Sequence, residues 1–210
     1  MEIIKLGNEE SINILIQPVD DHDLELINNE YIHIKNDYSN DFLLIAIKVD
    51  DWNYDLSPWK AQAVFGNNNF GDGARNTLNK IIDLCSDKKK RYFIGGYSLA
   101  GLFSLWAVYN TNIFSGVAAA SPSMWFLNFI DYMKSNEIKT NNVYLSLGDL
   151  EDKTKNKIIS TVKNNIIEAY NLLDDNVCKK LEWNIGNHFK DSDLRTAKAF
   201  AYILNKYNNL

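Results

Sequence analysis

The chain contains little cysteine and little proline, and each shortage excludes a class of protein. The two cysteines among 210 residues, Cys85 and Cys178, lie far apart and form no ligand motif. We therefore expect reduced, buried thiols and no disulfide framework. Three prolines leave no room for a proline-rich spacer. These absences predict a single domain over residues 1–210, which is long enough to bury a full core.

Long apolar runs and an excess of positive charge are also absent. No apolar stretch approaches the length of a membrane span, and residues 1–5 lack the charged and apolar zones of a signal peptide. The net charge of −5 argues against nucleic acid as the main partner. The basic run at 88–91 predicts a solvated helix end. We expect a cytoplasmic protein with neither a membrane nor a nucleic-acid partner.

Residues 94–101, Ile-Gly-Gly-Tyr-Ser-Leu-Ala-Gly, are the most informative stretch of the chain. A strand-like run precedes Ser98 and a helix-like run follows it, with Gly96 two residues before the serine and Ala100 two residues after it. Only small residues fit beside so tight a turn, which holds the hydroxyl out at the edge of a sheet. The pattern predicts a nucleophile elbow, with alanine in the last place of Gly-x-Ser-x-Gly. The alternative is an ordinary glycine-bearing turn with an exposed serine.

A serine nucleophile needs a base and an acid, which follow this elbow in the order acid, then histidine. Of three histidines, His188 alone lies after the elbow. Asp149, Glu151 and Asp152 lie between the two, directly after a predicted buried strand. Every candidate therefore falls at the carboxyl end of a strand, where sites form in open α/β sheets. Imidazole accepts the serine proton, and the carboxylate orients the imidazole.

The acid is assigned to Glu151, which stands three residues after Gly148, where the turn after this strand usually presents the acid. Asp152 is the alternative, and Asp149 is interpreted as a cap or turn residue. A further interpretation places all three in the acidic first turn of the next helix, where carboxylates favour the positive end of the dipole.

Strand-like and helix-like segments alternate along the chain. This order predicts an α/β fold with a mostly parallel sheet and helices on both faces. The expected strands are 2–6, 11–17, 42–49, 91–95, 115–120, 142–148 and 179–185. The expected helices are 22–30, 74–86, 99–110, 154–172 and 191–207.

Several segments carry a resemblance to a known family. They are the elbow at 95–103, a Ser-Pro-Ser-x-Trp segment within 116–125, the acid loop at 148–151, a Gly-Asn-His-Phe loop at 186–189 and an Asp-Leu-Ser-Pro segment at 55–59. With them the chain, from about residue 42 to the C-terminus, resembles the esterase family of α/β-hydrolases that includes siderophore (enterochelin-type) esterases and the mycolyl-transferring antigen 85 proteins. The resemblance implies an α/β-hydrolase fold and ester chemistry. No insertion is long enough for a large lid domain.

One departure from the family bears on the substrate. Siderophore esterases often place an arginine just before the Asp-x-Ser-Pro segment, where it would meet an anionic substrate. Trp52, Asn53 and Tyr54 stand there in this chain. The departure weakens the assignment of a siderophore substrate.

An oxyanion hole needs two backbone amides, and one should come from Leu99, the residue after the nucleophile. The other should come from the loop after the early strand, where relatives often have Asp-Gly or His-Gly in place of Gln17 and Pro18. Proline has no amide hydrogen, so Val19 is assigned as the donor and Asp20 as the alternative.

An acidic cluster, Asp20 to Asp23 with His22 inside it, could suggest a metal site. Capping of a helix over 24–30 is the stronger interpretation, because carboxylates are preferred at that position. We expect no metal and no organic cofactor.

A glycine-rich loop at 66–73 precedes a helix but lacks the Gly-Lys-(Ser/Thr) ending of a phosphate-binding loop. Asp72 within it would repel phosphate. We expect the loop to border an open cleft instead. The candidate walls of that cleft are Trp59, Phe70, Tyr97, Met124 and Trp125, with core packing as the alternative for each.

These features predict a serine hydrolase that cleaves small-molecule carboxylic esters through an acyl-enzyme. Two alternatives stay open. One is an acyltransferase with the same triad, and the other is a non-catalytic binding module on a hydrolase fold. The substrate's acyl and alcohol parts and the oligomeric state do not follow from the sequence.

Overall fold

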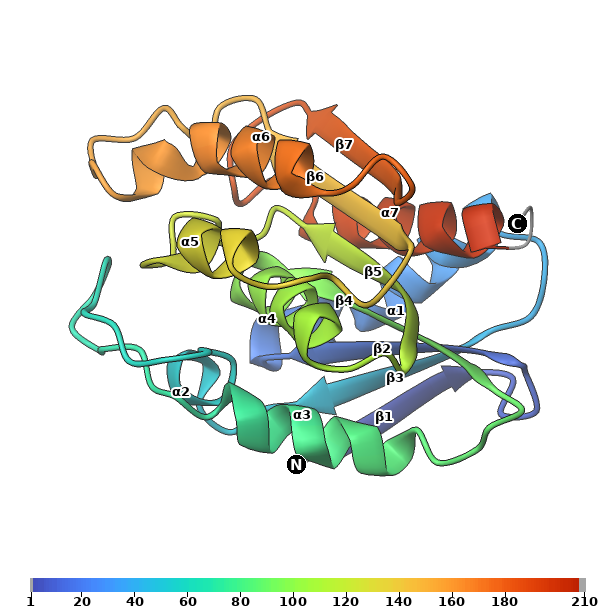
Figure 1. The fold of residues 1–210 in the computed structure, drawn as a ribbon. Coiled ribbons are helices and arrows are strands. Elements are labelled where there is room, and N and C mark those ends of the chain that lie inside the picture. The colour runs from blue at the N-terminus through green and yellow to red at the C-terminus, as the bar shows by residue number, and fades with distance from the viewer. Residues whose placement is uncertain (1, 208–210) are drawn as a thin grey trace.

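A seven-stranded sheet in the order β1-β3-β2-β4-β5-β6-β7 forms the centre of the molecule (Figure 1). The computed structural model describes residues 2–207. The strands are β1 Glu2–Gly7, β2 Asn13–Val19, β3 Leu43–Lys48, β4 Arg91–Tyr97, β5 Phe114–Ala120, β6 Asn142–Gly148 and β7 Cys178–Asn184. β1 runs antiparallel to β3, and every other neighbouring pair is parallel. The predicted mostly parallel sheet is confirmed.

The interior strands are apolar on both faces because helices cover both faces. In β2, Ile14 and Ile16 point into one core while Leu15 points into the other. Pro18 lies near the end of this strand, and the pairing of β2 with β4 stops at Ile16, whereas the pairing with β3 continues to Val19. The position fits a residue with no amide hydrogen to donate.

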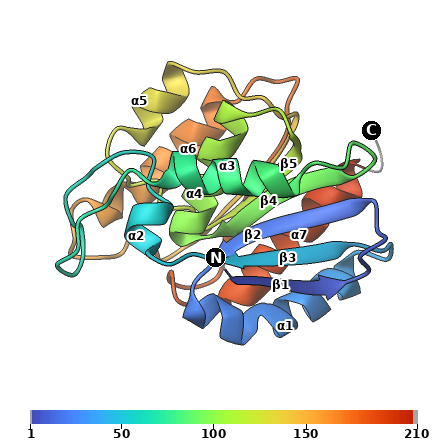
Figure 2. The same ribbon diagram turned by 90° about the horizontal axis from the view of Figure 1, so that it is seen from below.

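The helices form one layer on each face of the sheet, as Figure 2 shows. The layer on one face consists of α1 Asp21–Asp37 and α7 Ser192–Tyr207. The other face carries α3 Ala74–Leu84, α4 Ser98–Asn110, α5 Phe129–Lys134 and α6 Val162–Leu172. α7 presents an apolar stripe to the sheet, since Ala197, Phe200, Ala201 and Leu204 are buried. Within residues 2–207 no helix has both the length and the apolar character needed to cross a bilayer.

Two helix predictions were wrong in extent, and two short helices were missed. α1 continues to Asp37 because Ile34, seven residues after Ile27, extends the same buried face. The helix expected from 154 begins only at Val162, after a 3-10 turn at Ile159–Thr161. Before it, the Asn156 carboxamide accepts the N–H groups of Ile158 and Ile159 and donates to the Val64 carbonyl, which fixes a turn. The missed helices are α2 Trp52–Asp55 and α5.

Candidate active site

Ser98 lies at the junction of β4 and α4, as the elbow pattern predicts. Its φ of 56° is in the left-handed region, where a non-glycine residue is strained. Gly96 is required beside it, because a Cβ there would lie 2.7 Å from the Ala100 Cβ. Behind the turn, every residue of α4 from Leu99 to Tyr109 is buried, so the strained turn rests on a packed helix.

Three side chains from three loops form a continuous chain of hydrogen bonds. His188 Nε2 lies 3.0 Å from Ser98 Oγ, and His188 Nδ1 lies 2.7 Å from Glu151 Oε2. Ser98 comes from the β4–α4 turn, Glu151 from the loop after β6 and His188 from the loop after β7. Parallel strands bring their carboxyl ends to one edge of the sheet, which is why residues so far apart in sequence meet.

The two aspartates near Glu151 have other partners. The Asp152 carboxylate pairs with Lys153 Nζ at 2.9 Å, and this contact lowers the pKa of Asp152. Asp149 Oδ1 accepts the Gly186 N–H at 2.7 Å and so ties the acid loop to the histidine loop. The interpretation of these residues as a helical first turn was wrong, because they form turns well before α6 begins.

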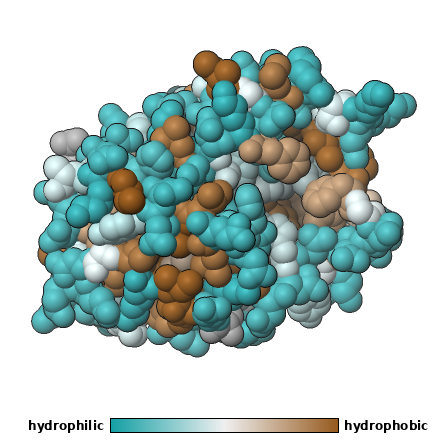
Figure 3. Space-filling model, turned by 180° about the vertical axis from the view of Figure 1, so that it is seen from behind, coloured by the Kyte–Doolittle hydropathy of each residue, from teal (hydrophilic) through white to brown (hydrophobic). Residues whose placement is uncertain are grey.

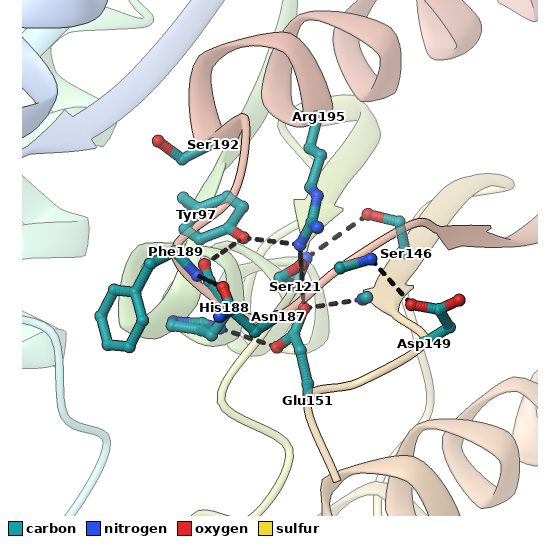
Figure 4. A network of polar contacts seen from close by, with 12 residues as sticks. Tyr97, Ser121, Ser146, Asp149, Glu151, Asn187, His188, Phe189, Ser192 and Arg195 are labelled. Atoms are coloured by element: carbon teal, nitrogen blue, oxygen red, sulfur yellow. Dashed lines mark hydrogen bonds and ion pairs between the residues drawn. The ribbon is translucent and has the colours of Figure 1, made fainter. Parts of the chain in front are cut away.

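Glu151 is nearly enclosed, with 3% of its side chain exposed. Its Oε1 accepts three hydrogen bonds, from Gly148 N at 2.7 Å, Ser121 Oγ at 2.8 Å and Arg195 Nη1 at 3.1 Å (Figure 4). These three donors, one of them a cationic guanidinium, hold the carboxyl group in place. The arrangement leaves Oε2 free to hold the imidazole.

Arg195 is a member of this site that the sequence reasoning missed. It lies in α7 in line with the buried Ala199 and Ile203, at the spacing of one helix face. An arginine in register with a buried apolar face is the signal that could have identified it, since charged residues are almost never fully buried without a partner. Its Nη2 also donates to the Ile185 carbonyl at 3.3 Å.

Tyr97, predicted as a cleft wall, is 6% exposed and instead holds the backbone of His188. Its hydroxyl donates to the His188 carbonyl at 2.7 Å and accepts from Arg195 Nη1 at 3.0 Å. Burial, reinforced by the charge of Glu151, raises the pKa of Tyr97 to about 12. The phenol therefore stays neutral and keeps its proton for the bond to the histidine loop.

The two predicted oxyanion donors differ in how well they fit. Leu99 N lies in the first turn of α4, where amides have no acceptor within the helix, and the turn has no side-chain cap. Val19 does not fit, because its carbonyl accepts from Val49 N at 3.1 Å. In a parallel ladder the amide of the same residue faces the same neighbour, here β3 and not the serine-bearing β4. The alternative, Asp20, is extended and follows the strand directly, so its amide faces the other way.

The acidic cluster at 20–23 caps a helix. Asp20 Oδ1 accepts the Asp23 N–H at 2.8 Å, and Asp21 pairs with Lys48. Burial and the nearby charge of Asp20 raise the pKa of Asp23 to about 7. No group of three metal-ligating side chains is found among residues 2–207. The capping interpretation is confirmed.

Three of the predicted cleft walls belong to the core, and a fourth, Trp59, is half-buried and packs against it. Met124 has no exposed surface, and Phe70 and Trp125 are 3% and 9% exposed. Trp59 packs against Phe126, Phe129 and Tyr132 and donates its indole N–H to the Leu127 carbonyl. Met124, Phe70 and Trp125 therefore offer a substrate little or no surface.

The glycine-rich loop uses its amides internally. Gly71 N donates to the Asn53 carbonyl at 3.0 Å and Gly73 N to the Tyr54 carbonyl at 2.9 Å. A Cβ on either glycine would collide with Tyr54. The loop thus packs on α2, with both of these glycine amides already bonded.

Exposed apolar side chains lie beside the histidine instead. Phe189 is 90% exposed and Ile185 78% exposed, and both flank His188 on the loop after β7. The Phe189 ring points away from the polar network (Figure 4). Leu150, 52% exposed, precedes Glu151. Figure 3, which faces α1 and α7, shows a hollow toward the end where the parallel strands finish, with large apolar side chains at its border.

The sheet order, the two helical layers and the serine at the β4–α4 turn define an α/β-hydrolase fold, as predicted. No family model matches the chain, and no curated protein matches its sequence. Solved structures do match.

The siderophore hydrolase EstA from Aspergillus nidulans has a TM-score of 0.72 at 17% identity, covering 97% of this chain and 89% of that one. An IroE-like serine hydrolase from Shewanella oneidensis has a TM-score of 0.66 at 12% identity, covering 99% of this chain and 75% of that one. The enterobactin esterase FES from Shigella flexneri has a TM-score of 0.63 at 13% identity, covering 99% of this chain and 56% of that one. At such low identities the likeness shows the fold alone.

Proposed function

We propose that the protein is a serine hydrolase that cleaves small-molecule carboxylic esters through an acyl-enzyme. The observation that carries the proposal is the unbroken chain of hydrogen bonds from Ser98 through His188 to Glu151, built on a strained elbow. The esterases and hydrolases among the structural neighbours support the same class.

The geometry supports the following sequence of steps. Ser98 Oγ attacks the acyl carbon while His188 Nε2 takes the hydroxyl proton, and Glu151 stabilises the imidazolium through Nδ1. The oxyanion of the tetrahedral intermediate accepts the N–H groups of Leu99 and Asp20. His188 returns the proton to the leaving alkoxide, which departs as the alcohol. Water then attacks the acyl carbon as His188 takes its proton, and the imidazolium returns that proton to Ser98 Oγ as the acid leaves.

A non-catalytic binding module is the less favoured alternative. Such a module has no need to hold a serine hydroxyl 3.0 Å from an imidazole that is itself oriented by a buried carboxylate. Strain at Ser98 with no chemical use would also lower stability without compensation. Both features favour an enzyme.

The surroundings of the site favour an ester with an apolar group. Phe189, Ile185 and Leu150 offer exposed apolar surface beside the proposed triad. The siderophores named for some neighbours are less favoured, because α2 places Trp52, Asn53 and Tyr54 where such esterases often carry an arginine.

The test pairs a fluorophosphonate probe with hydrolysis of short-chain p-nitrophenyl esters. Wild type should label and turn over, Ser98→Ala should do neither, and Glu151→Gln should lose at least about 100-fold in rate because the imidazole loses its orienting anion. Asp152→Asn is the matched control and should keep near-wild-type rates. A folded wild type that neither labels nor turns over would sink the proposal. Products formed with an added alcohol would separate hydrolysis from acyl transfer.

A further inference from the structure

We propose that Arg195 is a positioning residue whose buried positive charge balances Glu151, so that His188 stays neutral and able to accept the Ser98 proton down to lower pH. The inference deepens the proposed function and rests on it for the role of His188 as the base.

The geometry that points to this role is one carboxylate shared between the His188 imidazole and the Arg195 guanidinium. Glu151 presents Oε2 to His188 Nδ1 at 2.7 Å and Oε1 to Arg195 Nη1 at 3.1 Å (Figure 4). The side chains of Arg195 and Glu151 are 2% and 3% exposed, so water screens their interaction little. The imidazole is 30% exposed and can exchange protons with solvent.

Electrostatics gives the direction of the effect. A buried carboxylate beside an imidazole favours the imidazolium, which has no lone pair to accept the serine proton. A cation on the far oxygen offsets that attraction, because the Glu151–Arg195 pair presents little net charge to the ring. Without the cation, His188 would therefore become protonated at a higher pH than in wild type. Alternatively, Glu151 would take up the proton and lose its charge-assisted bond to the imidazole.

The other groups around the pair do not supply this charge. Tyr97 and Ser121 reach Arg195 Nη1 at 3.0 and 3.3 Å and are neutral hydroxyls. Asp149 is occupied by the Gly186 amide at 2.7 Å and carries negative charge, which adds to the same attraction. Among the described partners of Glu151, Arg195 supplies the permanent positive charge.

Gly148 leaves the space in which Glu151 and Arg195 meet free of any side chain. A Cβ at this position would lie 2.9 Å from Glu151 Oε1 and 3.0 Å from Arg195 Nη1. The strand end therefore has room for the two charged groups only because it lacks a side chain.

A simple structural staple is the competing explanation, and the test separates the two by charge. Arg195→Gln keeps hydrogen-bond donors but removes the charge, whereas Arg195→Lys keeps the charge. Arg91→Gln is the control for the change in net charge. Arg91 lies at the opposite end of β4, over the Tyr207 ring at 5.1 Å. The first readout is the pH dependence of kcat/KM for a p-nitrophenyl ester.

In Arg195→Gln the acid limb should move to higher pH by about one to two units, the usual effect of one close charge. The limb should move less than half as far in Arg195→Lys and not at all in Arg91→Gln. A loss of rate with an unmoved acid limb in a folded Arg195→Gln protein would overturn the proposal. If the glutamine variant does not fold, an acid limb that moves up by about one to two pH units in Arg195→Lys, which keeps the charge, counts against the proposal equally.

A second readout does not depend on turnover. His188 is titrated by NMR in the Ser98→Ala background, with and without Arg195→Gln. The imidazole should gain its proton at higher pH when the arginine is absent. If no ester is hydrolysed but this shift appears, the charge balance stands and the proposed hydrolase function fails. If esters are hydrolysed and neither readout shifts, the role of Arg195 fails and the hydrolase function stands.

Discussion

Replacing Glu30 by glutamine should stabilise the protein at neutral pH, although it removes a buried hydrogen-bonding carboxyl group. Glu30 is 4% exposed on the inner face of α1, and its Oε2 accepts from Gln17 Nε2 at 3.1 Å. The remaining oxygens of this pair, Gln17 Oε1 and Glu30 Oε1, are buried and have no partner. A protonated Glu30 would donate its O–H to the amide oxygen and complete a second hydrogen bond.

Burial raises the pKa of Glu30 well above 4.5, and the charges of Asp23 and Asp193 add to this. The folded protein therefore keeps a proton that the unfolded chain releases. Stability is full below the unfolded pKa and is lost as pH rises toward the folded one, by about 1.4 kcal/mol per pH unit. Glutamine is neutral throughout and its amide donates to Gln17 Oε1, so this loss disappears.

The assay is urea unfolding at pH 4, 5, 6 and 7 on wild type, Glu30→Gln and the control Glu25→Gln, an exposed position on the same helix. The stability of Glu30→Gln relative to wild type should grow by about 1.4 kcal/mol per pH unit above 4.5 until the folded carboxyl ionises. Asp23, with its pKa raised to about 7, adds a slope of the same sign to every protein. Parallel curves for wild type and Glu30→Gln would refute the reasoning.

Three further predictions follow from the site. Ser98→Gly should be more stable than Ser98→Ala by about 1 kcal/mol in free energy of unfolding, because glycine relieves the strain at a φ of 56°. Its melting temperature should be correspondingly higher, and equal melting temperatures would contradict this. Gly148→Ala should cost about 1–3 kcal/mol in urea unfolding and lower kcat, since its Cβ would lie 2.3 Å from the Gly186 carbonyl; an unchanged rate would argue against it. Phe189→Ala should leave stability within about 0.5 kcal/mol, because the ring is 90% exposed, yet lower kcat/KM more for a phenylacetyl or octanoyl ester than for acetate; an equal loss on all esters would remove Phe189 from substrate recognition.

Local patterns predicted the elbow and placed each candidate site residue at the end of a strand, because short-range sterics determine the turn and periodicity marks the strands. Ser98 sits at a strand-to-helix turn whose neighbours must be small, and this requirement is visible in eight consecutive residues. Glu151 and His188 follow from the rule that sites form where parallel strands end. Their mutual distances became visible only in the folded chain.

The missed features depend on contacts between distant segments. Arg195 stands in register with the apolar face of α7, but its partners Tyr97 and Glu151 are 98 and 44 residues away and meet it only when the helix docks on the sheet. Whether Val19 or Asp20 turns its amide toward Ser98 depends on the register of β2 with β3, which no local pattern sets. The large apolar residues predicted as cleft walls are of the same types that fill protein cores. The sequence therefore could not show that Met124 and Trp125 are buried.

The long sequence separations within the hydrogen-bond network also bear on how activity is acquired during folding. Ser98 and His188 are 90 residues apart, and Tyr97 and Arg195 are 98 apart. Contacts of such separation form late, because loop closure must precede them. During refolding, helical signal should therefore return before fluorophosphonate labelling. A chain whose α7 has not yet docked would carry an exposed serine with no aligned base, and would be chemically inert until its fold is complete.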